Sequence, residues 1–396
     1  MKLKNLTILS ISQALALTSG PIVLLVGGFI GTKLAPTPAL STLPLTITVV
    51  GTAIFIIPAV LLMKHIGRKN GFIASSFVAS ISSFGAAYAI ATKDFILFCL
   101  FMVFIGGNLA FAMQYRFAAA ESVEKQYIPK AVSFVLFGGI AAGFIGPEIA
   151  KRTKDLSSYG EYTATFFILA VLLMLVAFIF LSMKDIRLQE ETTSTKGRPL
   201  KVIIVQPLYL LALLAGTVAF GVMTYIMAAT PISMHLFDNL SLDKTTFVVQ
   251  SHMVAMYLPS LFTGLLINRI GVFRLMLIGT ILMFACVGLG LAGHEFVNYF
   301  GALVLLGVGW NFLFVGQTVL LPRSYLQNER YKAQAANDFI IFGVRAVITL
   351  SAGAVIAQTS WEFLNILVLP FLLVLLMILI KSRGRISAPT QETSLV

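Results

Sequence analysis

The chain has 396 residues, of which 58% are hydrophobic and only 11% are charged, and its mean hydropathy is +0.94. A soluble globular protein carries roughly 25% charged residues, so this composition excludes a large soluble enzyme. The net charge of +12 would suit a nucleic-acid-binding protein, but the placement of the basic residues, given below, excludes that class. Cys99 and Cys286 lie within apolar segments, and their spacing predicts neither a disulfide framework nor a metal site.

Apolar runs of about 18 residues or more are long enough to cross a membrane as helices. Twelve such runs follow one another, at about 7–31, 39–63, 71–91, 95–117, 130–150, 161–183, 201–229, 246–267, 273–293, 297–321, 334–357 and 361–381. The first run is too long for the apolar part of a cleavable signal peptide, so we expect it to remain as the first span. The sequence therefore predicts an all-α membrane protein with twelve transmembrane helices.

A polar break divides these helices into two sets of six. We expect an N-terminal bundle at 1–183, a central cytoplasmic loop at 184–200, a C-terminal bundle at 201–383 and a disordered cytoplasmic tail at 384–396. With the N-terminus inside, the cytoplasmic segments hold 21 of the 28 Lys and Arg residues and the outer segments hold 6. Positive charge collects on the cytoplasmic side. This predicts a membrane protein with both termini in the cytoplasm, and the basic composition needs no nucleic-acid partner.

The two halves of the chain share short sequence matches at nearly one offset. Gly106-Gly107-Asn108 with Gln114 matches Gly309-Trp310-Asn311 with Gln317 at an offset of 203, His65-Ile66-Gly67 matches Arg269-Ile270-Gly271 at 204, and Phe137-Gly138 matches Phe342-Gly343 at 205. Together they indicate two pseudo-symmetric six-helix bundles in the same orientation. In transporters built from such parallel repeats, the substrate site lies between the bundles near the membrane midplane.

These features resemble the major facilitator superfamily over nearly the whole chain. The family's signature loop, roughly Gly-x-Leu-Ala-Asp-Arg-x-Gly-Arg-Lys between the second and third spans, is matched by Gly67-Arg68-Lys69 at its end, whereas Val60, Lys64 and His65 replace the first glycine, the acid and the first arginine. The copy in the second half begins with Gly264 and ends with Arg269-Ile270-Gly271, and Asn268 replaces its acid.

Two further stretches refine this resemblance. Residues 143–147, Gly-Phe-Ile-Gly-Pro, are similar to the family's antiporter motif, but Ala150 and Lys151 stand where two glycines are expected. Segments 223–231, 252–264 and 309–345 are similar to a bacterial branch of the family that includes riboflavin importers. The resemblance thus implies a transporter of the bacterial cytoplasmic (inner) membrane and gives only weak support to an exporter.

Arg345 is the first candidate for substrate binding. It lies about eleven residues into the predicted 334–357 helix, or roughly 16 Å along it, near the centre of a hydrocarbon core about 30 Å thick. A charge at that depth is costly and usually functional. We expect Arg345 to hold an anionic or carbonyl group of the substrate; the alternative is a structural ion pair between helices.

Other polar or aromatic side chains in the predicted spans are candidates to line the same path: Gln13, Asn108, Gln114, Tyr225, Trp310, Asn311 and Gln317. The amides could equally form hydrogen bonds between helices, and Trp310 could simply pack. We expect no metal ion and no cofactor in this site.

A second set of residues is expected to serve coupling or gating: Lys64, Arg68, Glu148, His252 and Asp338. In the resembling family the acid of the signature loop meets the start of the eleventh helix; here Lys64 and Asp338 are predicted to form that latch with their charges exchanged. Asp338 could instead be a carboxylate that favours a helix start. His252 is a candidate proton relay or a core histidine, and Glu148 a coupling carboxylate or part of an ion pair at the rim.

The sequence therefore predicts a monomeric secondary transporter that moves a small organic solute by alternating access with proton coupling. We expect no enzyme activity, because the chain lacks His-Glu-x-x-His and Gly-x-Ser-x-Gly motifs, and no direct use of ATP, because it lacks a Gly-x-x-x-x-Gly-Lys loop. The weak antiporter motif favours import of a nutrient or cofactor, riboflavin-like or anionic; efflux of drugs or metabolites by proton antiport is the alternative.

Overall fold

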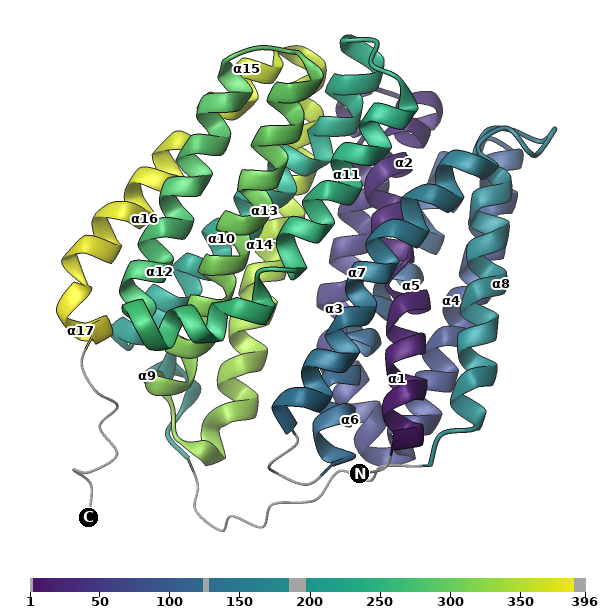
Figure 1. Ribbon diagram of the computed structural model, residues 1–396. Coiled ribbons are helices and arrows are strands. Elements are labelled where there is room, and N and C mark those ends of the chain that lie inside the picture. Colours follow the sequence, from purple (N-terminus) through teal and green to yellow (C-terminus); the bar gives the residue numbers. More distant parts are fainter. Residues whose placement is uncertain (1–2, 124–127, 185–196, 388–396) are drawn as a thin grey trace.

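The computed structural model describes residues 3–123, 128–184 and 197–387, and Figure 1 shows them as two bundles of helices standing side by side. The first bundle contains α1 (Leu3–Ala16), α2 (Ser19–Leu34), α3 (Leu43–Ile66), α4 (Arg68–Ala91), α5 (Phe95–Ala112), α6 (Tyr115–Glu121), α7 (Ile128–Thr153) and α8 (Thr163–Leu181). The second contains α9 (Leu200–Ile204), α10 (Pro207–Pro231), η3 (Ile232–Phe237), α11 (Leu242–Tyr257), α12 (Ser260–Leu291), α13 (Phe296–Leu320), α14 (Arg330–Gln358), α15 (Trp361–Ile366), α16 (Leu369–Lys381) and α17 (Arg383–Ser387). Short 3-10 turns, η1 (Pro38–Leu40), η4 (Leu321–Ser324) and η5 (Gln327–Glu329), lie between them.

Within the described residues, ten helical stretches are long and apolar enough to cross a membrane. The 26-residue α7 is an eleventh long helix. One of the ten, α12, contains the end of one span and the whole of the next, because its backbone leaves the helical conformation at Gly271. The part before Gly271 continues the span that begins in α11, through Leu258-Pro259. The part after Gly271 runs back in the opposite direction as the next span. The predicted all-α fold with two six-helix bundles is confirmed.

Proline and glycine shift some boundaries away from those expected from hydrophobicity. The predicted span 201–229 begins with the separate short helix α9, and α10 starts only at Pro207. Gln206 is extended, as is usual for a residue before proline. The predicted spans 246–267 and 273–293 join without a loop at Gly271. Residues 384–387, the start of the predicted disordered tail, belong to the short helix α17. The rest of the tail, and residues 185–196 of the central loop, lie outside the described residues.

The backbone supports the internal repeat. Gly67, between α3 and α4, has φ 84° and ψ 159°, and Gly271, inside α12, has φ 81° and ψ 160°. Residues that carry a side chain disfavour this region of positive φ, whereas glycine adopts it readily. The two glycines are 204 positions apart, the offset of the sequence match around them, so the same tight turn joins equivalent helices in both bundles.

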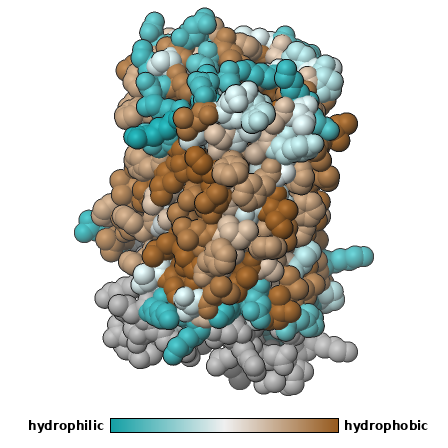
Figure 2. All heavy atoms as spheres, turned by 90° about the vertical axis from the view of Figure 1, so that its right-hand side faces the viewer, coloured by the Kyte–Doolittle hydropathy of each residue, from teal (hydrophilic) through white to brown (hydrophobic). Residues whose placement is uncertain are grey.

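The outer surface suits a bilayer. Figure 2 shows a band of hydrophobic side chains between more hydrophilic ends on the face that carries α4 and α8. These helices expose large apolar side chains, including Phe77, Ile81, Phe167 and Phe178. Both α1 and α17 lie at the lower end in Figure 1, which we call the terminal end; the opposite end, with the α2–α3, α7–α8 and η3–α11 connections, is the far end.

The two bundles contact each other in the far half of the molecule. Thr42 Oγ1 of the first bundle donates to the carbonyl of Thr349 in α14 at 2.9 Å. On the other side of the seam, Lys151 of α7 pairs with Asp243 of α11 at 2.6 Å. A rocking motion of one bundle against the other would therefore expose the residues along this seam.

Candidate functional site

Arg345 lies on α14 and points towards α10. Its Nε donates a hydrogen bond of 2.7 Å to Thr224 Oγ1, and its guanidinium carbon is 5.6 Å from the ring centroids of both Phe220 and Phe342. Among the described residues it forms no ion pair with a carboxylate, so the structural ion pair considered above is not found there. One nitrogen is thus fixed by Thr224, and the two terminal nitrogens have no protein partner in the described part of the chain.

The two rings beside this guanidinium belong to a connected group of aromatic side chains from four helices. Trp310 stacks on Phe314 with centroids 4.8 Å apart and planes 8° apart, and Phe220 meets the indole edge-on at 5.2 Å. Tyr257, at the end of α11, is 6.4 Å from Trp310 and interacts electrostatically with Arg345. We define the aromatic cluster as Phe220, Tyr257, Trp310, Phe314 and Phe342. Flat rings beside a cation suit a flat ligand that carries carbonyl groups.

The aromatic cluster lies at the seam between the bundles. On one side, Phe342 packs with Val49 and Ala53 of α3 in a small apolar core. On the other side, a Cβ placed on Gly139 of α7 would lie 3.7 Å from the ring of Tyr257. Residues at both edges of the cluster therefore touch the first bundle, as expected for a site reached from either end when the bundles move.

The pseudo-symmetric asparagines have opposite surroundings. The Asn311 amide nitrogen donates to the Met256 carbonyl at 2.7 Å and to Ser260 Oγ at 2.6 Å, and its oxygen accepts from Thr263 Oγ1 at 2.9 Å. Asn108 is also buried, but neither its amide nitrogen nor its oxygen has a hydrogen-bond partner among the residues that the structure describes. These contacts support a structural role for Asn311, tying α13 to the break between α11 and α12, and leave Asn108 available to a ligand or to water.

The repeat itself explains this difference. At the offset of 204, the positions equivalent to Ser260 and Thr263 are Ile56 and Ala59, which offer no side-chain hydrogen bond. A buried amide without partners costs about 1–3 kcal/mol. The first bundle therefore carries an unsatisfied polar group where the second has a complete network.

The remaining candidates for substrate binding are spread over the seam and the terminal end. Gln13 of α1 is buried, and its amide oxygen has no hydrogen-bond partner within the described segments. Tyr225 is buried next to Thr224. Gln317 donates to Asn337 at 3.4 Å, towards the terminal end, and Gln114 lies at the junction of α5 and α6. Phe220 packs against both Arg345 and the buried Trp310 and so connects these two candidates. Gln114 and Gln317 lie closer to the terminal end, and the binding role of all these residues remains a prediction.

The expected latch at Asp338 has an additional charged neighbour. Asn337 Nδ2 donates to Asp338 Oδ1 at 3.0 Å, and Arg116 of α6 interacts with this carboxylate electrostatically. Arg68 is buried at the start of α4. The side chain of Lys64 lies outside the described residues, so its pairing with Asp338 remains a prediction. Arg116 was not among the candidates predicted from the sequence, although its position two residues after Gln114 could have marked it.

His252 and Glu148 have different partners from those a proton path needs. The Nδ1 of His252 bonds to the Leu303 carbonyl at 2.8 Å, and its buried Nε2 has no partner in residues 3–123, 128–184 and 197–387. Glu148 accepts from Arg152 Nε at 2.6 Å and lines a pocket of about 370 Å³ at the far end, next to the Lys151–Asp243 pair. These contacts support the core-histidine and rim-pair alternatives, while a coupling role for either residue stays a prediction.

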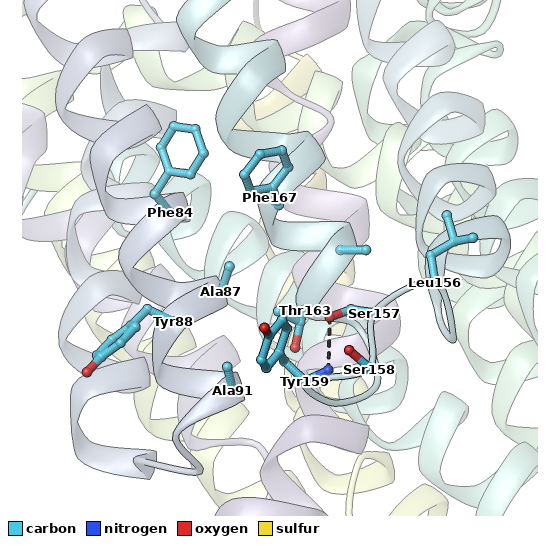
Figure 3. A pocket seen from close by; sticks show the side chains of 11 residues that line it. Phe84, Ala87, Tyr88, Ala91, Leu156, Ser157, Ser158, Tyr159, Thr163 and Phe167 are labelled. Atoms are coloured by element: carbon cyan, nitrogen blue, oxygen red, sulfur yellow. Dashed lines mark hydrogen bonds between the residues drawn. The ribbon is translucent and has the colours of Figure 1, made fainter.

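A larger pocket, of about 450 Å³, lies outside the seam. It is formed by α4, α8 and the loop before α8, and Figure 3 shows Phe84 and Phe167 on one side and Ser157, Ser158 and Tyr159 on the other. The rings of Phe84 and Phe167 meet edge-on at 5.2 Å. Because it faces outwards and contains no charged side chain, we do not assign it to transport.

The comparisons with known proteins agree with this architecture. The sequence model of the Major Facilitator Superfamily matches residues 8–241. The riboflavin transporter RfnT of Brucella anthropi is 35% identical over 386 residues, which are 96% of this chain and 97% of that protein. YdeG of Bacillus subtilis, an uncharacterized MFS-type transporter, is 27% identical over 402 residues, 96% of this chain and 92% of that protein.

Solved structures share the fold at low sequence identity. A bacterial homolog of the human lysosomal transporter Spinster, in an inward-facing and unoccupied conformation, matches with a TM-score of 0.75 at 11% identity and covers 98% of both chains. A mutant of the nucleoside transporter NupG matches with a TM-score of 0.71 at 15% identity and covers 95% of this chain and 99% of that one. The fold and the relatives are those of transporters and agree with the resemblance seen in the sequence. The chain is a multi-pass membrane protein that belongs to the major facilitator superfamily.

Proposed function

We propose that this protein imports riboflavin, or a similarly flat and carbonyl-bearing cofactor precursor, across the bacterial inner membrane. The single observation that carries the proposal is the guanidinium of Arg345 inside the aromatic cluster at the bundle seam. A flavin ring offers two carbonyl oxygens to a guanidinium and a large π-surface to Trp310. The 35% identity to a riboflavin transporter over nearly the whole chain supports the same substrate class.

In the proposed mechanism, bundles 1–183 and 201–383 rock about the seam while both termini stay in the cytoplasm. The far end is closed by contacts such as Lys151–Asp243 and Thr42–Thr349, and these must separate for substrate to enter from outside. Arg345 then binds the ring carbonyls with its two terminal nitrogens, while Thr224 holds its plane. Protons moving down their gradient drive accumulation in this scheme, and a single chain is the working unit.

The test uses purified protein in liposomes and radiolabelled riboflavin. We expect saturable uptake that is stimulated by an inward proton gradient and abolished in Arg345→Met. Outward movement driven by the same gradient would instead favour the antiport alternative. If the vesicles show no specific uptake, exchange or binding of riboflavin, riboflavin is excluded as the substrate. The same vesicles would then be tested with other flat carbonyl compounds.

A further inference from the structure

At the far end of the second bundle, His294 lies between two carboxylates. His294 follows α12, and its Nδ1 is 3.0 Å from Oδ2 of Asp238, which follows η3. Its Nε2 forms a short hydrogen bond with Oε1 of Glu362 in the first turn of α15. Tyr299 of α13 donates to the same Asp238 oxygen at 2.6 Å. Since that donation uses the only proton of the phenol, Ser233 Oγ, 2.6 Å from the Tyr299 hydroxyl, must be the donor to it.

This arrangement requires the protonated imidazole. A neutral histidine has one N–H, whereas both ring nitrogens here face acceptors, so only the imidazolium can donate on both sides. The hydrogen bond with Glu362, aided by Asp238, raises the pKa of His294 above its ordinary value despite partial desolvation. The two carboxylates lie at opposite edges of the ring and do not converge on one point. In the part of the chain that the structure describes, no group of His, Cys, Asp or Glu side chains could hold a metal ion.

The helices joined by this group also carry the candidate substrate site. Asp238 ends the span that contains Thr224, Tyr299 starts the helix that contains Trp310, and Glu362 follows directly on α14 and its Arg345. Through η3 the same group reaches the first bundle, because a Cβ on Gly28 of α2 would lie 3.1 Å from the side chain of Ile232. The ring of His235 in η3 is also 5.3 Å from Phe29.

We propose that Asp238, His294 and Glu362, the far-end clasp, form the proton-binding site that couples protons to transport, in place of the predicted His252. This inference rests on the proposed function, because it names the group that binds the transported proton. The titratable groups that face the imidazole are Asp238, Glu362 and Tyr299, and its side chain is 43% exposed. When a proton from the outer solution charges the imidazole of His294, the ring ties η3, α13 and α15 together. When this proton is lost, one ring nitrogen presents a lone pair to a carboxylate, and η3 is held less tightly against α2.

The sign of the pH dependence follows from this. The pKa of His294 is higher in the folded protein than in an unfolded chain, where it is about 6.5. The clasp therefore contributes its full stabilisation of the far end below about pH 6.5. This stabilisation is lost as the pH rises through the raised pKa of His294.

The first experiment titrates the histidines by NMR in ¹³C-histidine-labelled full-length protein in lipid nanodiscs. The chain has only four histidines, and His294→Gln assigns the signal by removing it. We expect a His294 midpoint above 6.5 that falls by about one pH unit in Glu362→Gln. The matched control is Glu295→Gln, the exposed neighbour of His294, which should leave the midpoint unchanged. A midpoint at or below 6.5 in the unsubstituted protein would overturn the proposal.

The second experiment measures the distance between spin labels on Thr37→Cys and Leu236→Cys, which are exposed on opposite bundles at the far end. The natural cysteines are buried. We expect the distance distribution to lengthen or broaden as the pH passes the His294 midpoint, and to show no such step in His294→Gln. The same pH response in both proteins would overturn the proposal. If His294→Gln does not fold, Glu362→Gln is used in its place. In that variant the pH at which the label distance changes should move by as much as the His294 midpoint measured by NMR.

Transport assays separate this inference from the proposed function. If the unsubstituted protein neither binds nor moves riboflavin, the substrate proposal fails, while the titration and the label distances still decide the clasp. If a proton gradient stimulates riboflavin uptake equally in the unsubstituted protein and in His294→Gln, the proposed function stands and the coupling role of the clasp is refuted.

Discussion

Replacing Arg345 by methionine should separate stability from transport. The guanidinium lies deep in an apolar bundle, where a cation pays a desolvation penalty, and among the described residues it has no carboxylate partner. Its compensation is one charge-assisted hydrogen bond to Thr224, worth about 1.5–3 kcal/mol, and contacts with two rings, each worth about 2 kcal/mol when desolvated. Substituting a buried charge by an apolar side chain of similar volume is often neutral or stabilising.

We therefore expect Arg345→Met to unfold at the same or a higher temperature than the unsubstituted protein, and to lose riboflavin uptake. Arg345→Lys keeps the charge but loses the planar fork that can hold two carbonyl oxygens. If that fork contributes about 1.4–3 kcal/mol to binding, KM should rise by about 10- to 100-fold. Thr224→Val, which frees the guanidinium plane but keeps the charge, should raise KM by about tenfold.

The assay pairs riboflavin uptake in proteoliposomes with thermal unfolding of the same preparations. Arg274→Met, at an exposed position in α12, is the matched control and should transport normally. Normal KM and kcat in Arg345→Met would refute the substrate role of this arginine. A large fall in its unfolding temperature would instead point to a structural role.

Three further outcomes follow from the contacts. Asn311→Ala removes three hydrogen bonds, each worth about 0.6 kcal/mol in membrane proteins, and should lower the unfolding temperature. Asn108→Leu removes atoms without hydrogen-bond partners, so it should keep the stability and reduce uptake. Equal destabilisation by both variants would contradict the difference between the repeats. Arg116→Asp should impair uptake several-fold, and adding Asp338→Arg should restore part of it; a double variant no better than Arg116→Asp alone would argue against this charge pair across the seam. Gly271→Ala forces a side chain into φ 81° and should cost roughly 1–2 kcal/mol of stability, measured by thermal unfolding; an unchanged unfolding temperature would show that the turn relaxes.

The sequence alone determined the number of spans, the two-bundle repeat and the family. These depend on local rules, because backbone groups in lipid must be satisfied within each helix and each span therefore needs its own apolar run. The depth of Arg345 is likewise a matter of counting along one helix. The turn at Gly67 and Gly271 could be located because the same tripeptide pattern recurs in both halves.

Only the tertiary structure decided which polar groups meet. Phe220 gave no signal beyond its apolar surroundings, because α10 is hydrophobic on every side and such a helix has no face that identifies its neighbours. Asn108 and Asn311 are equivalent in sequence and differ only through residues packed on them from another helix. His294 lay in a loop with no motif, and its two carboxylates are 56 and 68 positions away. Helix rotation and packing set these contacts, and a pattern within one segment carries no information about them.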